Sequence, residues 1–195
     1  MSQSDPRQDR TRQILRDALI KPVAEKPFEA ITIAEIAAGA RVARKTFYAH
    51  YADKVALLID CIQPLLAALS GRISNADSDT LLADNKPLSY PTCKHVEEHA
   101  AFYRAMLREN GSARFMLYLL DFLTRNSYER HAALRDAAPR ITVDPMLMAH
   151  FLAGALLNTL IWWLKQDCQL SAETMAYAFS QLAAPGILSA LGLDG

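Results

Sequence analysis

The stretch that decides the fold is TIAEIAAGARVARKTFYAHYADKVAL, from Thr32 to Leu57. Thr32 is a natural N-cap for a helix from Ile33 to Ala40, and a second short helix is expected from about Ala43 to His50. A third helix is expected to begin after Asp53. Two short helices joined by a tight turn predict a helix-turn-helix.

The second helix of this unit carries cations and hydroxyl groups that suit a DNA groove. Arg44 and Lys45 open it, Thr46 and Tyr48 follow, and Lys54 starts the next helix. Long cations reach bases or phosphates, and hydroxyl groups donate to phosphates. The pattern favours DNA binding, and replacing Tyr48 and Lys54 with Ala should weaken that binding and flatten its salt dependence. An ordinary helical hairpin with solvated charges is the alternative that the pattern leaves open.

The composition agrees with a helical globular protein. The chain has 195 residues, of which 51% are hydrophobic and only 7 are glycines, and it is long enough for one large domain or two small ones. The formal net charge is zero, but residues 1–54 carry ten Lys/Arg against seven Asp/Glu, so the N-terminal part is mildly basic. The three cysteines are odd in number and widely spaced, which indicates thiols in a reducing compartment.

Helical spacing of apolar residues extends along the rest of the chain. Further helices are expected over about 9–25, 53–69, 92–110, 112–137 and 145–166, with a last one from Ser171 that is interrupted at Pro185 and Gly186. Residues 74–92 are rich in Ser, Asp, Asn and Pro, and are expected to form a connection or a short irregular helix.

One segment of the C-terminal half is almost entirely apolar. Met146 to Leu164 is almost long enough to span a membrane, but we interpret it as a helix buried on several sides at a subunit interface. The polar N-terminus has no apolar segment typical of a signal peptide. A cytoplasmic protein without membrane contact is therefore expected.

Many residues of the N-terminal part match a known family of regulators. The matching positions are Phe28, Thr32, Ile33, Glu35, Ile36, Ala37, Ala40, Val42, Thr46, Phe47, Tyr48, His50, Tyr51, Lys54, Leu57 and Leu58. Over about residues 9–60 the chain resembles the DNA-binding domain of the TetR (tetracycline repressor) family. The resemblance implies an all-α fold, with a three-helix DNA-binding domain over 1–53 and a helical effector-binding and dimerisation domain over 54–195. It also implies contacts to double-stranded operator DNA from Thr32, Lys45, Tyr48, His50 and Lys54.

Two positions depart from the family pattern. Arg41 stands where the family usually has Gly at the turn, and Ala43 stands where it usually has Ser at the helix N-cap. A non-Gly residue in a left-handed turn and a missing Ser cap each destabilise locally by about 1 kcal/mol. We expect Arg41 to compensate through a phosphate contact, and the recognition helix of the free protein to fray.

The resemblance also implies how the C-terminal domain works. It would form a homodimer through the last two helices, where Ala149, Gly154, Ala155 and Asn158 would allow close helix approach. A small-molecule effector would release a repressor from its operator, and the alternative is control of the same DNA-binding fold by a protein partner, as in an activator. Candidate ligand-binding residues are Tyr103, Met106, Phe115, Tyr118, Phe122, His150, Asn158 and Trp162.

Two other classes of function are weighed against regulation. Cys93, His95 and His99 are close enough in sequence to hold zinc, but two histidines on a solvated face are more ordinary, so no metal site is expected. The sequence has no Gly-rich phosphate loop, Gly-x-Ser-x-Gly elbow or His-Glu-x-x-His motif. Neither an enzyme nor a cofactor is expected.

Overall fold

The computed structural model describes residues 5–23, 26–75, 86–107, 112–132, 136 and 140–192, and within these ranges it contains helices and turns but no strand. The chain forms two compact units. Unit 1 comprises residues 1–65 and 101–116, and unit 2 comprises residues 66–100 and 117–195. The expected all-α fold is confirmed.

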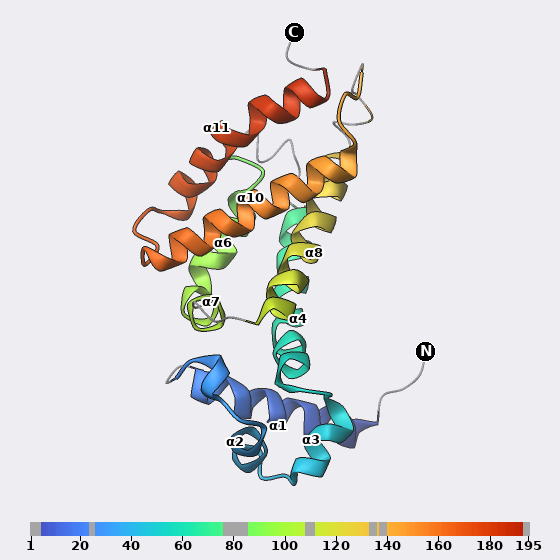
Figure 1. Ribbon diagram of the computed structural model, residues 1–195, viewed down its shortest axis with the longest axis vertical. Coiled ribbons are helices and arrows are strands. Elements are labelled where there is room, and N and C mark those ends of the chain that lie inside the picture. The colour runs from blue at the N-terminus through green and yellow to red at the C-terminus, as the bar shows by residue number, and fades with distance from the viewer. Residues whose placement is uncertain are drawn as a thin grey trace. The chain divides into compact units, whose positions relative to one another are not determined.

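The helices are shared between the two units (Figure 1). Unit 1 contains α1 (Pro6–Val23), the 3-10 helix η1 (Phe28–Ala30), α2 (Ile33–Gly39), α3 (Arg44–His50), the first part of α4 (Lys54–Asn75) and nearly all of α7 (Ala100–Met106). Unit 2 contains the rest of α4, α6 (Tyr90–Glu98), most of α8 (Ala113–Arg130), α10 (Pro145–Lys165) and α11 (Ala172–Ala190). Helix α4 thus belongs to both units, and the predicted domain boundary after residue 53 stays a prediction.

The core of unit 1 takes large apolar side chains from each of its first helices. Leu15 of α1, Phe28 of η1, Ile36 of α2, Phe47 of α3 and Leu57 of α4 are at most 2% exposed. Helices as short as α2 and α3 are not stable alone in water. Burial of Ile36 and Phe47 therefore holds them in place.

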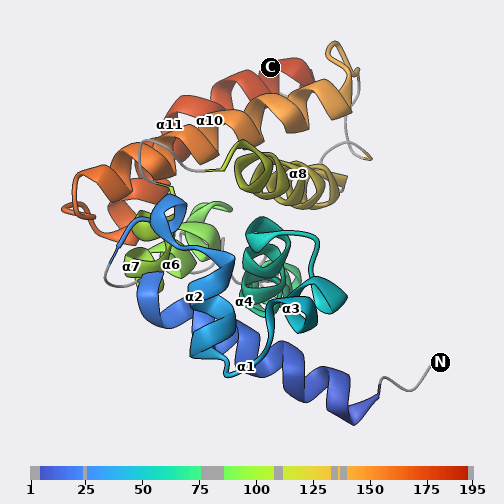
Figure 2. The ribbon, with the colours of Figure 1, turned by 60° about the horizontal axis from the view of Figure 1, so that its bottom comes forward.

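In unit 2, α10 and α11 run alongside each other, and α6 packs against α11 (Figure 1 and Figure 2). Met148 and Leu152 of α10 form a buried cluster with Leu191 at the end of α11. The Glu97 carboxylate of α6 accepts the backbone N–H of Ala172 at 2.9 Å, at the first turn of α11. Apolar packing and this cap connect the three helices.

Three expected helices differ from the structure. The helix expected over 112–137 ends as α8 at Arg130, and part of its remaining range lies outside the described residues. The helix expected over 92–110 is divided into α6 and α7, which meet at His99, and no proline or glycine marks this break in the sequence. The interruption expected at Pro185 and Gly186 was wrong, because α11 is continuous from Ala172 to Ala190. A proline removes one helical hydrogen bond, but Ala183 and Ile187 on either side of it pack against the same buried cluster with α10. This packing stabilises the helix on both sides of the proline.

Among the described residues, two helices are long and apolar enough to span a membrane by length and composition alone, over Lys54–Ile73 and Pro145–Lys165. Within the chain, α10 buries one side, which includes Leu152, Leu160 and Trp163. Its other side exposes Leu147 and Phe151. This second apolar side has no cover among the described residues, and its burial at a subunit interface stays a prediction.

Candidate nucleic-acid interface

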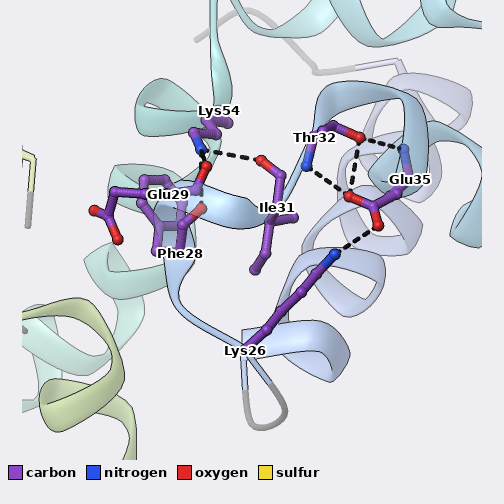
Figure 3. Close-up of polar contacts among 7 residues, drawn as sticks. All are labelled: Lys26, Phe28, Glu29, Ile31, Thr32, Glu35 and Lys54. Atoms are coloured by element: carbon purple, nitrogen blue, oxygen red, sulfur yellow. Dashed lines mark hydrogen bonds and ion pairs between the residues drawn. The ribbon is translucent and has the colours of Figure 1, made fainter. Parts of the chain in front are cut away.

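Helix α2 begins with a reciprocal pair of side-chain caps (Figure 3). The Thr32 hydroxyl accepts the backbone N–H of Glu35 at 3.2 Å, and the Glu35 carboxylate accepts the backbone N–H of Thr32 at 2.8 Å. The Thr32 hydroxyl also donates to this carboxylate, and Lys26 pairs with its other oxygen at 2.5 Å. The hydrogen bond from Lys26, followed by those from Thr32, lowers the pKa of Glu35 from 4.5 to about 2. The hydroxyl of Thr32 thus serves the cap, and its contact with DNA stays a prediction.

The turn between α2 and α3 closes through Arg41. Its φ of 55° lies in the left-handed region. The backbone N–H of Arg41 donates to Ala38 at 3.0 Å, and that of Val42 donates to Ala37 at 2.9 Å, which is the hydrogen-bond pattern of a Schellman motif. The left-handed conformation expected from the sequence is confirmed, and it is strained for an arginine.

The recognition helix α3 starts without a side-chain cap. Its N-cap residue, Ala43, has an extended backbone and no side-chain acceptor for the first amides. The helix is held from its inner face instead, where Phe47 is fully buried and its ring centre lies 5.9 Å from that of Tyr51. The Tyr51 hydroxyl donates to the Asp60 carboxylate of α4 at 2.5 Å. The missing cap at Ala43 expected from the sequence is confirmed.

The outer face of α3 and the preceding turn carry most of the predicted DNA contacts. The side chains of Arg41, Arg44, Lys45 and Tyr48 are exposed, and those of Thr46 and His50 are half-buried. Arg44 and Tyr48 are one helical turn apart and share a face, and Tyr48 is 58% exposed although its neighbour Phe47 is buried. A face of cations and hydroxyl groups on a short helix can reach phosphates and base edges.

Lys54 has a different environment from the other predicted contacts. Its Nζ donates to the backbone carbonyls of Phe28 at 2.9 Å, Glu29 at 2.8 Å and Ile31 at 3.0 Å (Figure 3). It also lies 4.7 Å from the centre of the Phe28 ring. Burial lowers the pKa of Lys54, and the charge of Glu29 acts in the opposite direction. The predicted phosphate contact of Lys54 stays a prediction, and the side chain has internal acceptors in this structure.

Unit 2 contains a cavity of about 210 Å³ between α6, α8, α10 and α11. Its walls are mostly apolar, and its polar lining residues are Ser89, Thr92, Asn126, Ser127, Arg130, His131 and Ser180. The Arg130 guanidinium donates to the backbone carbonyl of Ile73 in α4, and burial lowers its pKa. The cavity therefore combines an apolar body with a cationic side chain.

The eight residues predicted to bind a ligand all lie in described ranges, and none of them lines this cavity. Three are buried in unit 1: Tyr103, Met106 and Phe115. In unit 2, Phe122 is buried, Tyr118 is half-buried, and His150, Asn158 and Trp162 are exposed on α10. These assignments stay predictions.

The cavity itself offers a second set of candidate residues. Its signal in the sequence is a row of polar side chains on one side of α8, Asn126, Ser127 and Arg130, beside the apolar Leu123. Phe179 of α11 also lines the cavity, but the aromatic side chains that guided the sequence prediction do not.

The residues of the zinc alternative lie near one another on α6 and at its C-terminal end. His95 and Cys93 are buried, and the rings of His95 and His99 lie 4.7 Å apart. Burial, followed by the charge of His99, lowers the pKa of His95 to about 4. Glu98 pairs with Arg72 at 2.7 Å. In the part of the chain that the structure describes, no group of three or more His, Cys, Asp or Glu side chains could hold a metal ion.

Known regulators resemble this chain in sequence. Residues 15–61 match the family model of bacterial regulatory proteins of the tetR family, and residues 86–184 match a TetR model described as a transcriptional regulator C-terminal region. An uncharacterized HTH-type transcriptional regulator of Bacillus subtilis, YxbF, is 25% identical over 166 residues, which are 83% of this chain and 42% of YxbF. The chain therefore spans less than half of that protein. MftR of Mycobacterium tuberculosis, a candidate regulator of mycofactocin biosynthesis, is 24% identical over 185 residues, which are 91% of this chain and 92% of MftR.

Solved regulators share the fold. FadR of Thermus thermophilus has a TM-score of 0.68 and 21% sequence identity, and the match covers 91% of this chain and 95% of FadR. A TetR regulator of Streptococcus agalactiae has a TM-score of 0.65 and 22% sequence identity, and the match covers 91% of this chain and 95% of that regulator. The model of the C-terminal region alone covers just over half of the 195 residues. This chain therefore belongs to the TetR family of DNA-binding transcriptional regulators.

Proposed function

We propose that this regulator is a homodimeric, cytoplasmic repressor that leaves its operator when a small molecule occupies the cavity of unit 2. The observation that carries the DNA side of the proposal is the face of α3, where exposed Arg44, Lys45 and Tyr48 stand on a helix anchored by buried Phe47. The proposed contacts to DNA are Thr32, Arg41, Arg44, Lys45, Thr46, Tyr48 and His50.

The DNA contacts can be tested with a duplex recovered from a random-sequence library by the wild-type protein. Because each neutralised phosphate contributes about 0.9 to the slope of log affinity against log salt, Lys45→Met should lower that slope by about this amount. Tyr48→Ala should weaken binding by about tenfold, the effect of one good side-chain contact. Arg125→Met, at an exposed arginine of α8 in unit 2, is the control and should change neither quantity. Unchanged DNA binding in both Lys45→Met and Tyr48→Ala would contradict the proposed DNA-binding face of α3.

The dimer is supported by apolar side chains on the outer sides of α10 and α11. Phe151 is 70% exposed and Leu182 is 85% exposed. Large exposed apolar side chains on neighbouring helices are typical of an interface between subunits. Among the small residues predicted to allow close approach, Asn158 is exposed, while Ala149 is buried in the core of unit 2. Large apolar residues therefore form more of the proposed interface than the sequence pattern indicated.

The cavity supports a metabolite as the effector. Its volume of about 210 Å³ exceeds the roughly 150 Å³ of a dry cavity that binds benzene. Arg130 and His131 among apolar walls favour an apolar molecule with an anionic end. FadR of Thermus thermophilus, which shares the fold, was solved in complex with lauroyl-CoA. Apolar acids are therefore the first class of ligand to test.

Decanoate, decanol and decylamine are suitable probes because they share an apolar chain and differ in charge. Decanoate should raise the melting temperature and weaken DNA binding, and the other two should do so less. Arg130→Gln should reduce the effect of decanoate, and Arg125→Gln, an exposed arginine on the same helix, should not. Control by a protein partner, the alternative from the sequence, would leave the melting temperature unchanged with all three probes.

A further inference from the structure

The ammonium of Lys54 makes its hydrogen bonds inside the DNA-binding part of unit 1, residues 28–54, which we call the head. It is the first residue of α4, and its ammonium donates to three backbone carbonyls at 2.8–3.0 Å (Figure 3). An ammonium group has three hydrogens to donate. The three acceptors therefore match its full donor capacity, and a phosphate contact would have to replace one of them.

The acceptors belong to one short segment. Phe28 and Glu29 are in η1, and Ile31 is its C-cap residue. The Phe28 carbonyl also accepts the backbone N–H of Ile31 at 3.1 Å, and its oxygen has a second lone pair for the ammonium. The next residue, Thr32, is the N-cap of α2. Lys54 thus holds the chain at the point where the helix-turn-helix begins.

The same lysine stands where the helix-turn-helix ends. Three residues, 51–53, separate α3 from Lys54. Its hydrogen bonds reach back 23–26 residues to the segment before α2. Buried Phe28 and Ile31 fix that segment in the core, and Lys54 ties it to the first turn of α4.

We propose that Lys54 is a positioning residue, which joins the two ends of the helix-turn-helix through the η1 carbonyls and so sets the placement of α2 and α3 for DNA. The proposal rests on the DNA-binding function proposed above. It assigns to Lys54 an effect on operator affinity that acts through the head, without a direct contact to phosphate.

Salt dependence distinguishes the two roles. Lys54→Met should weaken binding to the selected duplex by about tenfold, because α2 and α3 are then less preorganised for DNA, and the slope of log affinity against log salt should be unchanged. Lys45→Met, the matched control on the exposed face, should lower that slope by about 0.9. A Lys54→Met slope reduced by the same amount, or an unchanged affinity, would overturn the proposal. A wild-type protein that selects no duplex would instead contradict the proposed function.

The conservative variant adds a second readout. Lys54→Arg keeps the charge, so a phosphate contact would be preserved. The planar guanidinium, however, cannot place its donors on three converging carbonyls as a compact ammonium does. We expect Lys54→Arg to bind DNA as weakly as Lys54→Met, and recovery of wild-type affinity would overturn the positioning role.

A measurement on the wild-type protein avoids any folding defect of the variants. Reductive methylation of lysines, read by mass spectrometry, should modify exposed Lys45 in the free protein and spare it in the DNA complex. Lys54 should react slowly in both states because its ammonium is held by the carbonyls. Rapid methylation of Lys54 in the free protein, with protection on DNA, would assign it to the phosphate backbone.

Discussion

At the scale of single residues, a few side chains determine where α2 begins and how the chain turns between α2 and α3. Glu35 accepts hydrogen bonds from the backbone and hydroxyl of Thr32 and from Lys26. Arg41 occupies a left-handed conformation that a glycine would adopt with less strain. The Thr32 cap could be predicted from residue type and spacing, and the strained turn at Arg41 was expected from the resemblance, since the family usually has Gly there.

The charge of Glu35 should be visible in the pH dependence of stability. Its pKa is lowered in the folded state from 4.5 to about 2, so the carboxylate stabilises the fold fully above the unfolded value and loses this effect as pH falls through about 2. The difference in unfolding free energy between wild type and Glu35→Gln, measured by urea denaturation, should narrow between these two pH values. In Lys26→Met, the pKa of Glu35 measured by NMR titration should rise toward 4.5, because the hydrogen bond from Lys26 is lost. A difference in unfolding free energy that does not depend on pH would contradict the lowered pKa of Glu35.

At the scale of secondary structure, α3 depends on its surroundings. It has 7 residues and no side-chain cap at Ala43, and a helix of this length does not form alone. Buried Phe47 and the turn through Arg41 hold it, while its first amides lack a side-chain acceptor. The recognition helix is therefore expected to fray from its N-terminal end in the free protein.

A restored cap should stabilise this helix. Ala43→Ser would provide an acceptor for the amides of the first turn and should raise the unfolding free energy by about 1 kcal/mol. Amide exchange of Lys45 and Thr46 should slow in the same variant. Ala49→Ser, an exposed position within the same helix, is the control and should have little effect or destabilise slightly. Equal exchange rates in wild type and Ala43→Ser would show that the end of the helix does not fray.

At the scale of the whole molecule, the outer faces of α10 and α11 predict the assembly. Leu182→Asp or Phe151→Asp should convert the dimer into a monomer, because burying an unpaired charge in an interface is costly. Leu117→Asp, a 65% exposed leucine on α8, should leave the dimer intact. Analytical ultracentrifugation measures these states. The monomeric variants should also lose DNA affinity, since a dimer reads two half-sites. A wild-type monomer would contradict the assembly.

The sequence by itself determined the features that depend on residues close together in the chain. Helical spacing and the Thr32 cap were predictable because capping and periodicity act over a few residues. The strained turn at Arg41 was expected from the resemblance, since the family usually has Gly at this position. Matching positions in this same region also allowed the family to be recognised.

The tertiary structure alone decided what depends on residues far apart. The carbonyl partners of Lys54 lie 23–26 residues earlier, and the cavity takes its lining from several separate helices. Helix α11 continues through Pro185 because α10 packs against it on both sides of the proline. Local patterns carry no information on such contacts, since the energy of a long-range hydrogen bond or a shared core depends on the folded arrangement and not on spacing in the chain.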